Sequence, residues 1–179
     1  YQTDLDLMGW EGEFAGEKLS PSHSKPVEII KEQNYFFKMG AFQDRVLEHY
    51  RTHPDFVMPE HARNEVISFG ERGLTDLSIS RSSFDWGIKL PWDPAHVLYV
   101  WVDALLNYAT AVGYGQDTGQ FERRWPPAVH IVGKDILRFH AVIWPAMLMA
   151  AGPPLPEHVF WPGWLLVGGE KMSKSKLTG

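Results

Sequence analysis

Short apolar runs alternate with longer helical patterns in the second half of the chain, and this alternation constrains the fold more than any other feature. The helical patterns cover residues 104–112, which Gly113 ends, and residues 136–151, which a Gly-Pro-Pro sequence ends. Predicted strands flank them at 97–102, 129–132 and 159–167. Strands that alternate with helices form parallel sheets with right-handed crossovers. The sequence therefore predicts an α/β fold built on a parallel sheet.

The first part of the chain has a different pattern. Glycines, prolines, acids and serines interrupt residues 1–34, which predicts the loops and short strands of a small irregular lobe. Residues 35–75 predict a helical linking segment, because apolar residues recur at helical spacing from Phe36 to Tyr50 and a second helix is expected at 59–69. A brief strand at 77–81 then opens the third region, 76–179, which carries the strand and helix alternation.

Composition limits the chemistry that the chain can perform. Its 179 residues include no cysteine, which excludes disulfides, thiolate catalysis and cysteine-based zinc sites. With 17 Lys and Arg against 22 Asp and Glu, the net charge is −5, so a broad nucleic-acid-binding surface is not expected. Residues 1–10 lack the basic start of a signal peptide, and the apolar run at 142–151 is too short to span a bilayer. We therefore expect a cytoplasmic protein without membrane contact.

Two turns that follow predicted strands carry residues suited to a nucleotide. Gly133-Lys134-Asp135 joins a strand to a helix, at the sheet edge where α/β folds bind ligands. Gly133 allows an adenosine to approach closely, and Asp135 can accept hydrogen bonds from both ribose hydroxyls. A helix N-cap is the alternative role for Asp135, and it does not exclude the first.

The second turn is Gly168-Gly169, and it presents the string Lys171-Met172-Ser173-Lys174-Ser175. A double glycine allows backbone amides to approach a polyphosphate. Lysines three positions apart are flexible charges suited to a leaving pyrophosphate, and the serines add hydroxyl donors. On charge alone, a solvated basic segment is the more common meaning of such a cluster.

The lysine string resembles the KMSKS signature of class I aminoacyl-tRNA synthetases, in the form found in methionyl-tRNA synthetases. Six further segments resemble that family in the same order, and together they separate it from the isoleucine, valine and leucine enzymes. They are EQNYFF (32–37), NEVISF (64–69), LSISR (77–81), SFDWG (83–87), YVWVDALLNY (99–108) and GKDILRFHAVIWPAM (133–147). The resemblance covers about residues 27–179 and implies the second half of a Rossmann-type catalytic domain, preceded by part of a connective peptide.

The resemblance also implies roles for individual residues in binding methionine. Trp101, Ala104 and Tyr108 line the methionine pocket, His140 closes it, and Arg81 helps to organise the methionine and ATP sites. Aromatic walls suit a thioether because its polarizable sulfur packs well against ring edges. Plain core packing is the alternative for the aromatic residues and for His140, and a structural salt bridge is the alternative for Arg81.

For the nucleotide, the resemblance implies that Gly133 and Asp135 bind the adenosine of ATP, which enters with Mg²⁺. Lys171, Ser173, Lys174 and Ser175 stabilise the pyrophosphate, with Lys174 the most important of the four. The implied reaction is the activation of methionine to methionyl-adenylate, followed by transfer to tRNA(Met).

The chain departs from the family pattern in four places. It has no HIGH-like element, which would belong to a preceding half of the catalytic domain, and no helical anticodon-binding domain. The expected zinc knuckle lacks ligands, because His23 is the only nitrogen donor before Glu32, so no zinc is expected. Pro162 stands where the family usually has a histidine. These departures leave open a non-catalytic fragment or scaffold that retains weak methionine or nucleotide binding, or a nucleotidyltransferase of related fold.

Overall fold

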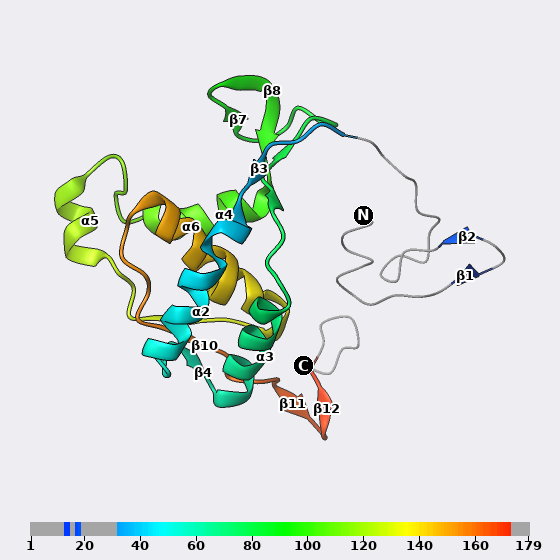
Figure 1. Cartoon of the computed structure of the whole chain (residues 1–179), viewed down its shortest axis with the longest axis vertical. Helices are drawn as coiled ribbons and strands as arrows, with labels where there is room; N and C mark the ends of the chain where they lie inside the picture. Colours follow the sequence, from blue (N-terminus) through cyan, green and yellow to red (C-terminus); the bar gives the residue numbers. More distant parts are fainter. Residues whose placement is uncertain (1–12, 15–16, 19–31, 173–179) are drawn as a thin grey trace. The chain divides into compact units, whose positions relative to one another are not determined.

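The structure is a computed structural model that describes residues 13–14, 17–18 and 32–172 (Figure 1). The chain divides into two units, Tyr1–Gln33 and Asn34–Gly179. In the first unit, the strands β1 (Glu13–Phe14) and β2 (Glu17–Lys18) pair antiparallel. All the elements discussed below belong to the second unit.

A three-stranded parallel sheet confirms the predicted α/β class. Its order is β4 (Val57–Met58), β10 (His158–Phe160), β9 (Val129–Ile131), with β10 in the middle. Strand β9 was predicted, whereas the two-residue strand β4 was not, because so short a run gives no period to recognise.

The two faces of this sheet differ in burial. Val159 is in register with Val57 and His130, and all three side chains are at most 5% exposed. Because side chains alternate along a strand, Val129 and Ile131 lie on the opposite face, where they are 43% and 71% exposed. Parallel sheets are normally covered on both faces. Within the described residues, the second face is left largely open at β9.

Helices pack against the buried face and enclose the main core. The helix that ends in α6 runs through the middle of the unit, with α2 and α4 on either side of it (Figure 1). The helical elements are η1 (Met39–Phe42), α2 (Gln43–Thr52), α3 (Glu60–Glu71), α4 (Val100–Thr110), α5 (Thr118–Arg124), η2 (Lys134–Ile136), η3 (Phe139–Ile143) and α6 (Trp144–Ala151). None of the helices in the described part of the chain has the length and apolar character needed to cross a membrane.

The prediction for 97–102 was wrong. The strand β8 (Asp93–Leu98) ends before this run does, and α4 begins at Val100 with Tyr99 as its extended N-cap. Strand β8 lies in a separate antiparallel sheet, between β6 (Ser80–Arg81) and β7 (Lys89–Leu90), and not in the parallel sheet. A short apolar run fits either a strand or a buried helix, so its period could not separate them.

Two further predicted elements are divided in the structure. The strand expected at 77–81 becomes β5 (Leu77–Ser78) and β6, which pair with different partners. The partner of β5 is β3 (Phe36–Phe37), so the first residues of the helix expected from Phe36 are extended instead.

The strand expected at 159–167 ends at Phe160. Pro162 lacks the N–H that a ladder requires, and Gly163 has φ 88°, which L side chains rarely adopt. A hairpin follows, in which β11 (Leu166–Val167) pairs with β12 (Glu170–Lys171). Its two-residue turn uses Gly168 and Gly169 at φ 62° and 86°, as a type I′ hairpin turn requires.

The long helix predicted at 136–151 is present, but its hydrogen-bond pattern changes along its length. It starts as the 3₁₀ turn η2, passes through the π-helical segment η3, and becomes α-helical at α6, which Gly152 ends at φ 97°. The hydroxyl of buried Tyr50 on α2 donates to the carbonyl of Ala141 within the π-helical segment. This side-chain donor satisfies a carbonyl where the regular ladder is interrupted.

Replacing Tyr50 with Phe should destabilise the protein, because the Ala141 carbonyl then stays buried without this donor. We expect a loss of about 1–3 kcal/mol in the free energy of unfolding. Urea unfolding followed by circular dichroism measures it. Tyr35→Phe is the matched control, since its hydroxyl bonds to Asp93 on the surface and its removal should cost less than about 1 kcal/mol. Equal losses in both variants would contradict this account.

Candidate functional site

Helix α4 carries the predicted methionine-pocket residues on one face. Trp101, Ala104 and Tyr108 are spaced three and four apart, so they lie along one side of the helix. Trp101 was expected near the end of the strand predicted at 97–102, but it lies in the first turn of α4. Its ring stacks on Phe139, with centroids 4.1 Å apart, and Ala104 and Tyr108 are partly open to solvent.

Tyr108 and His140 make a direct hydrogen bond. The Tyr108 hydroxyl lies 2.9 Å from Nε2 of His140, and Nδ1 of the same ring lies 3.0 Å from the Ile136 carbonyl. A carbonyl can only accept, so Nδ1 carries the proton. In the neutral ring, Nε2 is then the acceptor, and the Tyr108 hydroxyl donates to it. Both groups are thereby fixed in orientation.

The surroundings keep this imidazole neutral. Burial lowers the pKa of His140, although its bond to the Ile136 carbonyl acts in the opposite direction. A second buried histidine, His130 on β9, lies with its ring centroid 5.5 Å from that of His140 and 4.5 Å from that of Tyr108. Burial first, and repulsion from His140 second, bring the pKa of His130 to about 4.

His130 was not predicted as a site residue. Its Nε2 is buried and has no hydrogen-bond partner among the described residues. A histidine in the middle of a β-branched strand is a possible signal, but the strand pattern alone does not distinguish it from a core position. Tyr108 therefore contacts two imidazoles whose pKa values are lowered, and the three rings contact one another pairwise. This environment suits an apolar, polarizable group with one weak polar contact.

The turn predicted to bind adenosine, Gly133-Lys134-Asp135, is open at its glycine. A Cβ built on Gly133 would meet no other atom within 4 Å, so this position is unobstructed. Gly133 is the N-cap of η2 and Asp135 lies within the turn, exposed, so the N-cap role considered for Asp135 is not realised. Lys134 and Arg138 on either side of Asp135 form ion pairs with Glu65 of α3.

The partners of Arg81 in the described part of the chain are neutral groups. Its Nη1 donates to Ser78 Oγ at 2.8 Å and to the Ser80 carbonyl at 2.7 Å, and its guanidinium lies 4.2 Å from the ring centroid of Tyr99. Among the described residues no carboxylate forms a salt bridge with it, so the structural salt bridge considered for Arg81 is not present there. A guanidinium held by neutral partners keeps its charge available for an anionic ligand.

The lysine cluster is only partly placed. Lys171 lies in β12, directly after the hairpin turn at Gly168-Gly169. Ser173, Lys174 and Ser175 lie outside the described residues. Within the residues that are described, no group of three His, Asp or Glu side chains could hold a metal ion.

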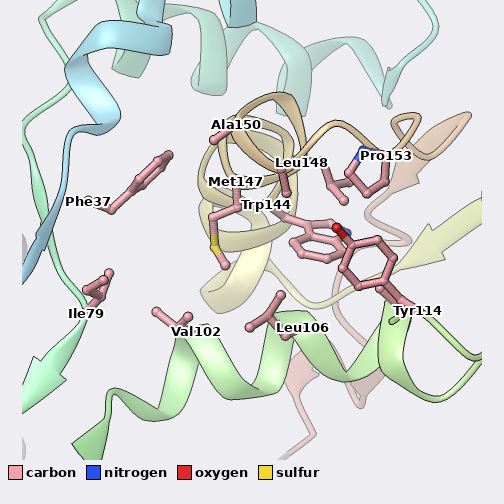
Figure 2. Close-up of a pocket in the computed structure, with 12 residues that line it drawn as sticks. Phe37, Ile79, Val102, Leu106, Tyr114, Trp144, Met147, Leu148, Ala150 and Pro153 are labelled. Atoms are coloured by element: carbon pink, nitrogen blue, oxygen red, sulfur yellow. The ribbon is translucent and has the colours of Figure 1, made fainter. Parts of the chain in front are cut away.

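A separate apolar cavity of about 290 Å³ lies on a different face of α4, the one that carries Val102, Leu106 and Ala109 (Figure 2). Val102 and Leu106 of α4 point into it across from Met147 of α6, and Tyr114 closes one end. Trp101, Ala104, Tyr108, His140 and Arg81 do not line this cavity. Trp144 is the link between the two faces, because it lines the cavity while its ring lies 6.4 Å from that of Tyr108.

Stability should fall as the pH is lowered from about 6.5 towards 5. His130 and His49 both have a folded pKa of about 4, whereas an unfolded histidine titrates near 6.5. In this interval the unfolded chain binds more protons than the folded one, so acid favours unfolding. Urea midpoints at pH 7.0, 6.0 and 5.0 measure the effect, and His130→Gln should reduce the slope. A midpoint that stays constant or rises towards pH 5 would contradict the burial of neutral imidazoles.

Comparison with known proteins places the chain in a family. A family model described as "tRNA synthetases class I (M)" matches residues 15–179. The methionine–tRNA ligase of Streptomyces coelicolor is 63% identical over the whole chain, and that of Bacillus subtilis is 52% identical over 98% of it. The chain spans 33% and 27% of the length of these two relatives.

Solved structures agree with this assignment. Methionyl-tRNA synthetase from Mycobacterium tuberculosis, bound by methionyl-adenylate, superposes with a TM-score of 0.82 at 52% identity, over 92% of this chain and 32% of that one. The apo form of the same enzyme gives a TM-score of 0.79 over 86% of this chain and 31% of that one. The family match, the sequence identities and the shared fold agree, and the chain belongs to the class I methionyl-tRNA synthetase family.

Proposed function

We propose that this chain is the segment of a methionine–tRNA ligase that supplies the wall of the methionine pocket, the adenosine-binding turn and the KMSKS loop. The observation that carries the proposal is the Tyr108–His140 hydrogen bond beside the Trp101–Phe139 stack, at residues whose motifs match the family. The ligand in one solved relative, methionyl-adenylate, contains both of the groups that such a site would bind.

The reaction has two steps. A carboxylate oxygen of methionine attacks the α-phosphorus of ATP, the bond to the bridging oxygen breaks, and pyrophosphate leaves. A ribose hydroxyl of the terminal adenosine of tRNA(Met) then attacks the activated carbonyl, and AMP leaves. Neither step needs a thiol, in agreement with the absence of cysteine. Both depend on positioning and on stabilisation of developing negative charge.

Methionine recognition falls to the aromatic face of α4. The thioether packs against Trp101, Ala104 and Tyr108, and the neutral state of His140 avoids placing a charge beside sulfur. Because the Tyr108 hydroxyl is committed to His140, the pocket offers an oriented dipole at this point. The guanidinium of Arg81 is suited to an anionic oxygen of methionine or of the phosphates.

ATP binding falls to the turn at Gly133 and to the lysine loop. The open space at Gly133 accommodates adenosine, and the exposed Asp135 accepts from its ribose hydroxyls. Lys171 and Lys174, with Ser173 and Ser175, stabilise the leaving pyrophosphate. Mg²⁺ is expected to enter bound to the ATP phosphates, where it neutralises charge, and the chain's own residues need not form its site.

The three regions of the chain correspond to three parts of the ligase. Residues 1–34 are the end of a connective peptide without a zinc site, residues 35–75 are a helical linking segment, and residues 76–179 are the Rossmann-type half that ends in the KMSKS loop. The rest of the ligase completes the site. The exposed Val129 and Ile131 on the open face of the sheet are then covered by the other half of the catalytic domain.

Tyr108→Phe in the full-length protein should weaken methionine binding, because His140 Nε2 loses its donor. We expect the KM for methionine in ATP–pyrophosphate exchange to rise about tenfold, with a much smaller change in the KM for ATP. Tyr114→Phe, which alters the separate cavity on the other face of α4, should leave both values unchanged. Equal effects of the two variants would contradict the assignment of the methionine pocket.

Lys174→Ala tests the catalytic role against a scaffold role. In a ligase, loss of one donor to the developing charge should lower the rate of methionine-dependent exchange about 10²–10³-fold, with protein stability unchanged. Lys176→Ala, outside the signature, is the matched control. An exchange rate that Lys174→Ala does not alter would favour the non-catalytic scaffold, and exchange without methionine would favour a nucleotidyltransferase of other specificity.

A further inference from the structure

Helix α3 presents a stripe of three side chains to the adenosine turn. His61, Glu65 and Phe69 are four residues apart, so they lie on one side of the helix. The ring of His61 meets the buried ring of Trp161 edge to face, with centroids 4.8 Å apart. Glu65 and Phe69 contact the two cations that flank Asp135. No role was predicted for these three residues: the helix was expected as part of a linking segment, although Glu65 and Phe69 belong to the NEVISF motif that resembles the family.

Glu65 is shared between the two cations. Its Oε1 accepts from Arg138 Nη2 at 3.3 Å, and its Oε2 lies 3.9 Å from Lys134 Nζ. Each cation also lies near an aromatic ring: Arg138 is 4.6 Å from the centroid of Phe69, and Lys134 is 5.6 Å from that of Trp161. One carboxylate and two rings therefore restrict the side chains immediately before and shortly after the exposed Asp135.

These contacts orient the turn more than they stabilise the fold. The side chains of Glu65, Arg138 and Lys134 are 30%, 37% and 45% exposed, and ion pairs that water reaches contribute little to stability. The turn itself is short: η2 has three residues, and its closing bond from the Ile136 N–H to the Gly133 carbonyl measures 3.2 Å. Side-chain anchoring therefore has a large share in fixing where Asp135 lies.

We propose that Glu65 is a positioning residue for nucleotide binding. It holds Lys134, and through Lys134 the Gly133-Lys134-Asp135 turn, in the position where the Asp135 carboxylate meets the ribose of ATP. The inference rests on the proposed function, since it concerns the same nucleotide turn. It assigns α3 a role in the site, although no residue of α3 needs to touch the ligand.

The test uses the full-length protein in methionine-dependent ATP–pyrophosphate exchange. Glu65→Gln keeps the shape of the side chain but removes its charge, and it should raise the KM for ATP about threefold to tenfold, with kcat and the KM for methionine within about twofold of wild type. Glu60→Gln is the matched control. Glu60 lies on the same helix and pairs with Arg63, and its side chain is 78% exposed. The Glu60→Gln variant should leave all three values unchanged.

A second variant approaches the same contact from the other side. Lys134→Met should also raise the KM for ATP. The double variant with Glu65→Gln should raise it by less than the product of the two single effects, because both changes remove the Glu65–Lys134 pair, while Glu65→Gln alone also weakens the pair with Arg138. Thermal unfolding midpoints of all variants should match wild type.

Three results would overturn the proposal: an unchanged KM for ATP in Glu65→Gln, additive effects in the double variant, or a lowered unfolding midpoint with equal changes in both KM values. The last result would indicate a merely structural role. Wild-type protein without exchange activity would instead refute the proposed function, so the two failures are distinguishable.

Discussion

The packing of helix α4 against the helical segment that contains His140 is the contact on which the rest of the site depends. Near the start of α4 Trp101 stacks on Phe139, and near its end Tyr108 donates to His140. Between them, Leu105 shares a buried cluster with Trp144. The π-helical turn shifts the ladder at this point, and the Tyr50 hydroxyl satisfies one of its carbonyls. A polar pair is thus held in orientation inside a mostly apolar contact.

The parallel sheet and α3 hold the Gly133-Lys134-Asp135 turn at the start of the segment that leads to this contact. Strand β9 ends just before Gly133, and the helix that follows begins with the turn and continues to His140. One continuous segment therefore carries both the turn proposed for adenosine and the histidine proposed for the methionine pocket. Glu65 pairs with Lys134 and Arg138 near the beginning of that segment, and Tyr108 bonds to His140 in its middle. This arrangement explains how the two substrates of an adenylate-forming reaction could be aligned by few residues.

The sequence predicted the elements whose periods are long and whose ends are marked. The helix at 136–151 and its end at Gly152 are confirmed, as is β9, because a long apolar period followed by a Gly-Pro-Pro sequence is a clear signal. The run at 97–102 was ambiguous, and the structure resolves it into the end of an antiparallel strand and the start of α4. Pro162 and Gly163 divided the last predicted strand, an effect that proline chemistry predicts in principle.

Some contacts of the candidate site could be predicted from the sequence, and others could not. Tyr108 and His140 were expected near one another from family motifs, and their side chains do meet, although their roles remain predictions. The positions of His130 and Glu65 depend on which strand and helix face the turn, which no local pattern in the chain encodes. Tertiary contacts of this kind follow from topology and not from spacing along the sequence.

A structure of the full-length protein with methionyl-adenylate tests the central claim most directly, since the residues proposed for methionine and the apolar cavity lie on different faces of α4. The account expects the methionine sulfur within about 4 Å of the Tyr108 hydroxyl or the His140 ring, and the ribose at Asp135. A methionine side chain bound in the cavity between Leu106, Tyr114 and Met147, with no ligand atom in contact with Tyr108 or His140, would contradict it.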